Sequence, residues 1–271
     1  MNAAACIGAV VDALGLPANA RVDIRVPKKI LVEQGAPTST DRRAIQDGID
    51  ELVWFAACKP STVGVPAFAD EIRDYVEIAV IGCTFREGAK SSRLIELIHR
   101  AIPYPVILIT ADDKGIDLSV AHKRRAHNEA AKVVIDRNAI THLTDPTMPT
   151  SNEKAFLHSL ALSKLSHQDL YALYDGWLAR TEGMNAANLV GSYSVTTDEH
   201  QIARRREAIE DYERLAKENS VLRSQAAKAK QISQRVDLNQ KIKAIERAME
   251  QAKQAMGASS HEDFDHSGPY R

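Results

Sequence analysis

The sequence predicts an α/β (or α+β) fold: a mixed sheet with flanking helices, followed by a helical connector and a long C-terminal coiled-coil helix. Helix-type and strand-type hydrophobic patterns alternate up to about residue 137. From residue 199 to 256 the chain contains neither glycine nor proline and repeats apolar residues at heptad spacing. We therefore expect an α/β domain at residues 1–148, a connector at 149–198, a coiled-coil arm at 199–256 and a disordered tail at 257–271.

Composition narrows the class of protein. The formal net charge of the 271 residues is −1, so no global field draws the chain to DNA or to an acidic membrane. No segment approaches the roughly 20 apolar residues of a membrane span, and the N-terminus lacks the basic region of a secretory signal. Cys6, Cys58 and Cys83 are widely spaced and odd in number, which argues against a disulfide framework or a zinc site. We expect a cytoplasmic protein with no cofactor and no metal.

The first elements are a helix and a strand. Apolar residues recur at helical spacing over 7–14, and Gly15 ends the helix that they predict. Apolar residues alternate over 22–26 and predict a strand, which Pro27 ends.

A second helix is predicted between two further signals. Thr38 and Asp41 stand at capping-box distance and open it, and the helix must stop before Pro60. Apolar residues with a period of 3.6 fill the segment: Ile45, Ile49, Leu52, Val53 and Ala56.

The remaining elements of the first part complete the sheet. The apolar, β-branched run 77–85 predicts a strand buried on both faces, and a helix follows at about 90–102. Residues 106–112 predict a strand that turns at 113–115 into a return strand from Ile116, and 132–136 predict one more strand.

The connector and the arm are predicted to be helical. Capping boxes at Thr150–Glu153 and Ser166–Asp169 open the two helices of the connector. The arm shows two heptad stretches that are out of register by two residues, with Ile232 and Val236 in the slip. A continuous helix over 202–256 would be about 80 Å long, so it needs a partner chain or folds back near the slip; a solvated single helix is the alternative. The predicted oligomerisation residues are Tyr212, Leu215, Asn219, Leu222, Leu238, Ile242, Ile245 and Met249.

Catalytic motifs are scarce. The chain has no P-loop, no dinucleotide-binding glycine motif, no zinc-protease motif and no nucleophile elbow. The order helix, strand, strand, helix, strand suggests a metal-dependent restriction-type nuclease, for which Glu71, Asp74 and Glu77 are the candidate acids. No lysine stands two residues after Glu77, so this nuclease with an atypical motif is only the alternative.

Basic residues form two groups, each expected at the end of a strand. Lys28 and Lys29 form the first, and His122, Lys123, Arg124 and Arg125 lie in the second. Two or three cations can hold one or two phosphates, which gives weak, salt-sensitive contact with DNA. The solvated end of a strand explains these residues equally well.

The N-terminal half resembles a bacterial family known as the domain of unknown function 4391. The residues that carry the resemblance are Val26–Leu31, Val53–Trp54, Lys59–Thr62, Val65–Pro66, Tyr75–Ile81, Ala101–Ile109 and Leu118–Arg124. The resemblance implies a protein that is often encoded beside a helicase-like ATPase and a DNA methyltransferase, in loci that look like restriction-modification or antiphage defence systems.

From residues and resemblance together we expect a non-enzymatic accessory or adaptor subunit. Its α/β domain would dock to the helicase-like ATPase or the methyltransferase, and its C-terminal helix would oligomerise. The second basic group, together with Lys28 and Lys29, would contact phosphate or an acidic protein surface. A free-standing DNA-binding protein is disfavoured by the balanced charge.

Overall fold

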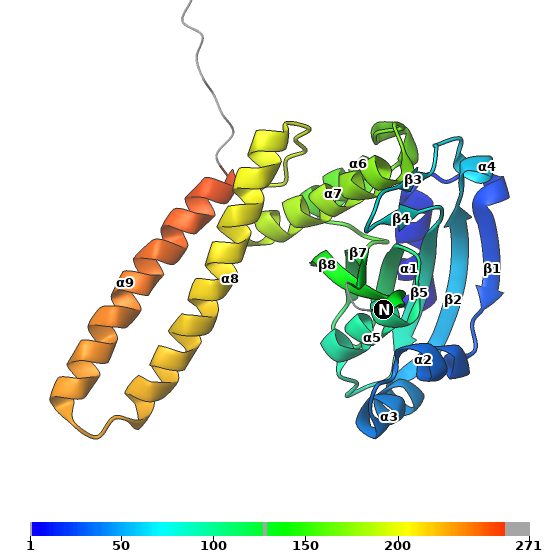
Figure 1. The fold of residues 1–271 in the computed structure, drawn as a ribbon. Coiled ribbons are helices and arrows are strands. Elements are labelled where there is room, and N and C mark those ends of the chain that lie inside the picture. The colour runs from blue at the N-terminus through cyan, green and yellow to red at the C-terminus, as the bar shows by residue number, and fades with distance from the viewer. Residues whose placement is uncertain (1, 127–128, 258–271) are drawn as a thin grey trace, which may run out of the picture. The chain divides into compact units, whose positions relative to one another are not determined.

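A computed structural model describes residues 2–126 and 129–257. The chain divides into two compact units, the first ending at Asn185 and the second beginning at Ala186. The first unit contains a mixed six-stranded sheet in the order β1-β2-β5-β6-β7-β8 (Figure 1). Its strands are β1 (Arg21–Arg25), β2 (Ile49–Cys58), β5 (Ile78–Phe85), β6 (Val106–Ala111), β7 (Ile116–Ala126) and β8 (Glu129–Leu143). The predicted class, a mixed sheet with flanking helices, is confirmed.

Neighbouring strands are antiparallel except β5 and β6, which are parallel. A parallel pair needs a crossover, and helix α5 (Ser91–Ala101) supplies it. The predicted hairpin is β6 and β7, with Ala111 opposite Ile116. The other helices of this unit are α1 (Ala3–Ala13), α2 (Lys28–Gly35), α3 (Ser39–Gly48), α4 (Pro60–Val63) and α6 (Ser151–Ser159), with short 3-10 turns at Ala18–Ala20 and Leu162–Lys164. A separate two-stranded sheet pairs β3 (Phe68–Ala69) with β4 (Asp74–Tyr75).

Helices cover both faces of the sheet because β5 is apolar on both. Ile81 and Cys83 belong to a core that contains Leu94 and Ile98 of α5. On the opposite face Gly82 lies so close to α1 that an added Cβ would come within 2.9 Å of Ile7, and it would come within 2.4 Å of Phe55 on β2. The predicted burial of this strand on both faces is therefore confirmed.

The prediction of one helix from Asp41 to the residue before Pro60 is wrong in its second half. Thr38 caps α3 as predicted, accepting a hydrogen bond from the Asp41 N–H, but α3 ends at Gly48 and β2 follows. The register of β2 against β5 shifts at two places, between Ile49 and Glu51 and between Trp54 and Ala56. Such bulges add a residue, so the buried positions of β2 fall at helix-like spacing.

The segment predicted as a connector forms α6 and α7 (Leu170–Val190), and the boundary between the units lies within α7. Thr150 and Glu153 form the predicted capping box of α6. At the second predicted box the cap is Asp169 rather than Ser166, because the Asp169 carboxylate accepts a hydrogen bond from the Ala172 N–H at 2.8 Å.

The arm forms two helices in place of one long one. Helix α8 (Glu199–Lys228) and helix α9 (Ile232–Gly257) pack side by side as a hairpin (Figure 1). The reversal lies immediately before Ile232, at the predicted slip between the heptad stretches. The two stretches therefore face each other within one chain. The tail prediction for 258–271 lies outside the described residues.

Candidate functional site

The second basic group lies on β7, and the structure separates its members by depth. His122 and Lys123 are buried, with exposed fractions of 2% and 4%. Arg124 is half-buried and Arg125 is exposed. Strand β7 lies between β6 and β8, and its first five residues, Ile116–Val120, pair with both neighbours. Only the two arginines reach solvent to any extent, and they are the members able to meet phosphate or an acidic surface.

His122 joins three elements. Its Nδ1 lies 2.5 Å from the hydroxyl of Tyr75 on β4, and its Nε2 lies 3.1 Å from Asp175 on α7. Arg137 on β8 also pairs with Asp175. Burial lowers the pKa of His122. Although burial raises the pKa of Asp175, its hydrogen bond with His122 and the charge of Arg137 hold that pKa down at about 2. The arrangement fixes the position of β7.

Tyr174 extends the pairing of β6 and β7 beyond the end of their ladder. Its hydroxyl accepts a hydrogen bond from the Ala121 N–H at 2.7 Å and lies 2.7 Å from the Val106 carbonyl oxygen and 3.2 Å from that of Ala121. An aromatic cluster packs with the imidazole of His122, and its members are Phe68, Tyr75, Tyr171 and Tyr174.

Lys123 points to the other side of β7 and fastens the connection between α5 and β6. Its Nζ donates to the carbonyl oxygens of Ile102 at 2.6 Å and of Tyr104 at 2.5 Å. Burial lowers the pKa of Lys123 to about 7. The side chain is thus a structural donor to two main-chain carbonyls.

The two arginines are held in ion pairs on one side of a small cavity. Arg124 pairs with Asp136 and Arg125 with Asp74, both at 3.3 Å. The cavity has a volume of about 200 Å³. We call it the basic cavity, and its lining is Ile72, Asp74, Val76, Pro103, Tyr104, Pro105, Lys123, Arg124, Arg125 and Val133.

An apolar groove of about 410 Å³ adjoins the basic cavity, because Pro103 and Tyr104 line both. We call it the apolar groove. Ile24 and Ile30 line it with exposed fractions of 58% and 46%, and Tyr104 is 39% exposed. The full lining is Ile24, Arg25, Val26, Pro27, Ile30, Leu31, Gln34, Leu52, Trp54, Ala79, Ile81, Ala101, Ile102, Pro103 and Tyr104. Many of these residues carry the family resemblance described above.

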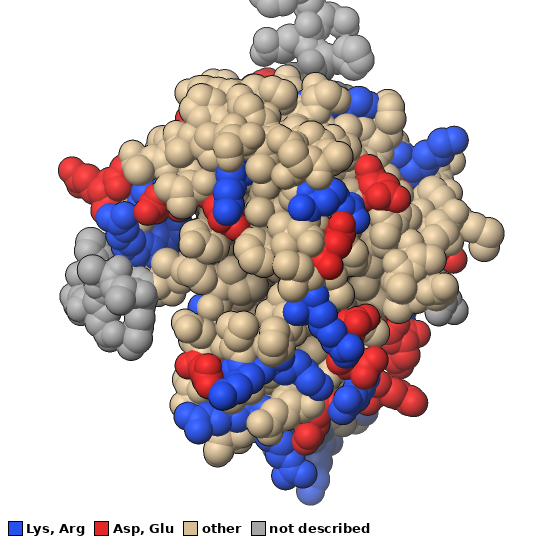
Figure 2. All heavy atoms as spheres, turned by 90° about the vertical axis from the view of Figure 1, so that its right-hand side faces the viewer, with Lys and Arg blue, Asp and Glu red and all other residues tan. Residues whose placement is uncertain are grey.

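The first basic group is not at a strand end, because Lys28 and Lys29 form the first turn of α2. Lys28 donates to the carbonyl oxygens of Ile49 at 2.7 Å and Gln46 at 3.3 Å. Lys29 is exposed and pairs with Glu33. Neither lysine lines the apolar groove or the basic cavity. Figure 2 shows lysine and arginine side chains interspersed with aspartate and glutamate on the face that it draws.

The candidate acids have separate partners. Asp74 pairs with Arg125, and buried Glu77 pairs with Lys59 at 3.1 Å. Glu71 is exposed. Over residues 2–126 and 129–257, no three His, Cys, Asp or Glu side chains are grouped so that they could hold a metal ion.

Most of the predicted oligomerisation residues pack inside the hairpin. Leu238 and Ile242 are buried, the Asn219 amide lies 3.8 Å from the Met249 sulfur, and Arg223 pairs with Glu246 across the helices. Tyr212, Leu215, Leu222 and Ile245 are half-buried. Part of the heptad seam thus has its partner within the same chain.

Sequence reasoning missed the partners of His122. Its position could have been inferred, because the alternation of Ile116, Leu118 and Val120 continues to residue 122 and places it on their face. Tyr174, Asp175 and Arg137 carry no comparable signal, since their contacts with β7 depend on how distant segments pack.

One family model matches residues 14–249 of the chain, and its description is a domain of unknown function, DUF4391. Neither the curated proteins nor the solved structures gave a match. Among the described residues, every helix is too short or too polar to cross a membrane.

Proposed function

The chain belongs to the DUF4391 family, and from this premise we propose that it is a non-enzymatic accessory or adaptor subunit. Its α/β domain docks to a helicase-like ATPase or a DNA methyltransferase, in a restriction-modification-like antiphage defence system of the bacterial cytoplasm. The observation that carries the proposal is the exposed apolar groove and its continuity with the basic cavity. Exposed apolar surface that is contiguous in this way marks a surface that binds another molecule.

The linings of the two cavities support a partner segment that is apolar in one part and acidic in the next. Apolar side chains fill the groove beside Ile24, Ile30 and Tyr104, and an acidic group lies near Arg124 and Arg125. This group competes with Asp136 and Asp74, whose ion pairs are at the surface and contribute no more than about 1 kcal/mol each. A DNA phosphate competes in the same way, so contact with DNA is weak and salt-sensitive.

Charge introduced into the apolar groove should abolish docking. We expect Ile30→Glu and Tyr104→Glu each to weaken binding of the purified ATPase or methyltransferase by roughly tenfold or more, because a buried, unpaired carboxylate replaces apolar contact. Isothermal titration calorimetry measures the dissociation constants. Met148→Glu is the matched control, since Met148 is 79% exposed and lines neither cavity. Unchanged affinity in both groove variants, with the fold intact by circular dichroism, would refute the docking site.

We also propose self-association through the turn of the hairpin. Val221, Ile232 and Val236 are exposed there, with exposed fractions of 56%, 79% and 48%. Light scattering should show a dimer or higher oligomer for the full chain and a monomer for Ile232→Glu with Val236→Glu. Ser233→Glu with Gln240→Glu introduces the same charge at exposed polar positions of α9 and should leave the oligomer intact. A monomeric wild-type chain would exclude this part of the proposal.

A metal-dependent nuclease is the second candidate, favoured by one observation. The elements α3, β2, β5, α5 and β6 follow the order helix, strand, strand, helix, strand, with α4, β3 and β4 inserted between β2 and β5. The ion pair between Glu77 and Lys59 opposes it, because the carboxylate that would hold the metal already has a cationic partner. The adaptor remains the preferred function.

A further inference from the structure

The charge of the helical hairpin is divided unevenly along its length. We call residues 219–249 the basic tip, which comprises the end of α8, the turn and the larger part of α9. They contain seven lysine or arginine residues and two acids, which gives a net charge of +5. The whole chain has a net charge of −1, so the other 240 of its 271 residues carry −6. The balanced total therefore conceals one strongly basic surface.

The cations of the basic tip are exposed and mostly unpaired. The two helices pack through buried residues such as Leu238 and Ile242, so their basic residues lie around one short double rod. Arg223 pairs with Glu246 across the helices. Among the residues that the structure describes, the six other cations of the tip have no ion pair and no side-chain hydrogen bond: Lys228, Lys230, Arg235, Lys241, Lys243 and Arg247. Such a cluster of like charges attracts an extended anion.

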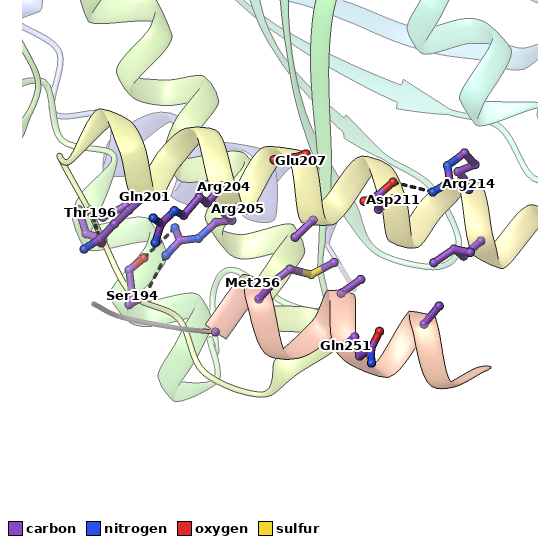
Figure 3. Close-up of a pocket in the computed structure, with 17 residues that line it drawn as sticks. Ser194, Thr196, Gln201, Arg204, Arg205, Glu207, Asp211, Arg214, Gln251 and Met256 are labelled. Atoms are coloured by element: carbon purple, nitrogen blue, oxygen red, sulfur yellow. Dashed lines mark hydrogen bonds and ion pairs between the residues drawn. The ribbon is translucent and has the colours of Figure 1, made fainter. Parts of the chain in front are cut away.

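The other end of the hairpin does not share this imbalance. Figure 3 shows Arg204, Arg205 and Arg214 there, along a groove of about 610 Å³, interspersed with Glu207 and Asp211. Asp211 pairs with Arg214 at 2.7 Å. Acids close by thus compensate the arginines at this end, which makes it the natural comparison for the basic tip.

The side chains of the basic tip discriminate between anionic partners. Residues 213–257 contain no aromatic residue and no histidine, so the bases of a single strand have nothing on which to stack. An α-helix is about 10–12 Å across and fits the major groove of duplex DNA, which is about 12 Å wide. The major groove of duplex RNA is too narrow to admit one. Lysine and arginine on an exposed helix therefore fit duplex DNA best.

We propose that the basic tip binds the phosphate backbone of duplex DNA without regard to sequence. Lys243 and Arg247 stand about one helical turn apart on α9, and each contacts a phosphate. The other free cations of the tip add further phosphate contacts. Binding releases counterions from the DNA, so the affinity falls steeply as salt rises. The tip belongs to the second unit, so this contact uses neither the apolar groove nor the basic cavity.

Fluorescence anisotropy of a short labelled DNA duplex, titrated with the full chain, tests the proposal. The logarithm of the association constant should fall linearly with the logarithm of the salt concentration, with a slope of about −0.9 for each phosphate contacted. Lys243→Gln with Arg247→Gln removes two contacts, so the slope should become less negative by about 1.8 and the affinity at about 0.1 M salt should fall roughly 60-fold. A second duplex of unrelated sequence should bind equally well.

Arg204→Gln with Arg214→Gln is the matched control, because it removes the same charge from exposed positions at the other end of the hairpin. It should leave slope and affinity unchanged. Neither variant replaces Val221, Ile232 or Val236, the residues proposed for self-association. No binding of the duplex by the wild type at low salt would overturn the proposal, as would an equal loss in the two variants. Tighter binding to duplex RNA, to a single strand or to vesicles of anionic phospholipid would refute the assignment to duplex DNA.

Discussion

Replacing Tyr174 by phenylalanine is expected to lower the free energy of unfolding by about 3 kcal/mol, because it removes one hydroxyl that serves several buried main-chain groups. The Ala121 N–H loses its acceptor and the Val106 carbonyl loses its donor, both just beyond Ile107 and Val120, the last pair of the β6–β7 ladder. Urea denaturation followed by circular dichroism measures the change.

Tyr171→Phe is the control for this prediction. Tyr171 lies on the same helix and in the same aromatic cluster, but it is only half-buried. Its hydroxyl should contribute less than about 0.5 kcal/mol, as is usual away from buried networks. A loss in Tyr174→Phe no larger than the loss in Tyr171→Phe would show that the hydroxyl of Tyr174 does not hold the end of the β6–β7 ladder.

Lys123 should make the free energy of unfolding rise with pH, whereas a lysine whose pKa is raised by an ion pair makes it fall. Burial lowers its pKa to about 7 in the folded chain, whereas an unfolded lysine titrates near 10.4. Between these values the unfolded chain holds a proton that the folded chain lacks, so the free energy of unfolding rises with pH. The expected slope from this residue is about 1.4 kcal/mol for each pH unit, and below pH 7 the cost of burying the charge is fully present.

Lys123→Met isolates this contribution. The variant loses the two hydrogen bonds to Ile102 and Tyr104 at every pH, so its absolute stability is not the test. The test is the difference between wild type and variant in urea unfolding from pH 7 to 10. We expect that difference to grow with pH; a constant difference would mean that Lys123 stays protonated in the folded chain.

Local patterns predicted most of the sheet because β5, β6 and β7 have continuous or alternating apolar residues. They failed at β2, where bulges place Ile49, Leu52 and Ala56 at intervals of three and four residues. Such intervals are those of an amphipathic helix. Pairing with β1 on one side and β5 on the other decides the conformation, and no window of sequence contains that information.

The site was predicted in part. The basic group at residues 122–125 was recognised, but charge alone could not show that His122 and Lys123 are buried. The apolar groove brings together residues from β1, α2, β2, β5 and α5. Each of these residues has an ordinary place in its own element, so the groove exists only after the elements pack.

The slip of two residues between the heptad stretches has a consequence for evolution. Removing two residues between Ala229 and Leu238 would place Tyr212 and Ile242 in one uninterrupted register. In such a chain nothing favours a reversal between the two helices. Each heptad stretch would then pack against the complementary stretch of a second copy, which is domain swapping. Loop length, with no change in seam chemistry, thus determines whether this arm is self-contained or shared between molecules.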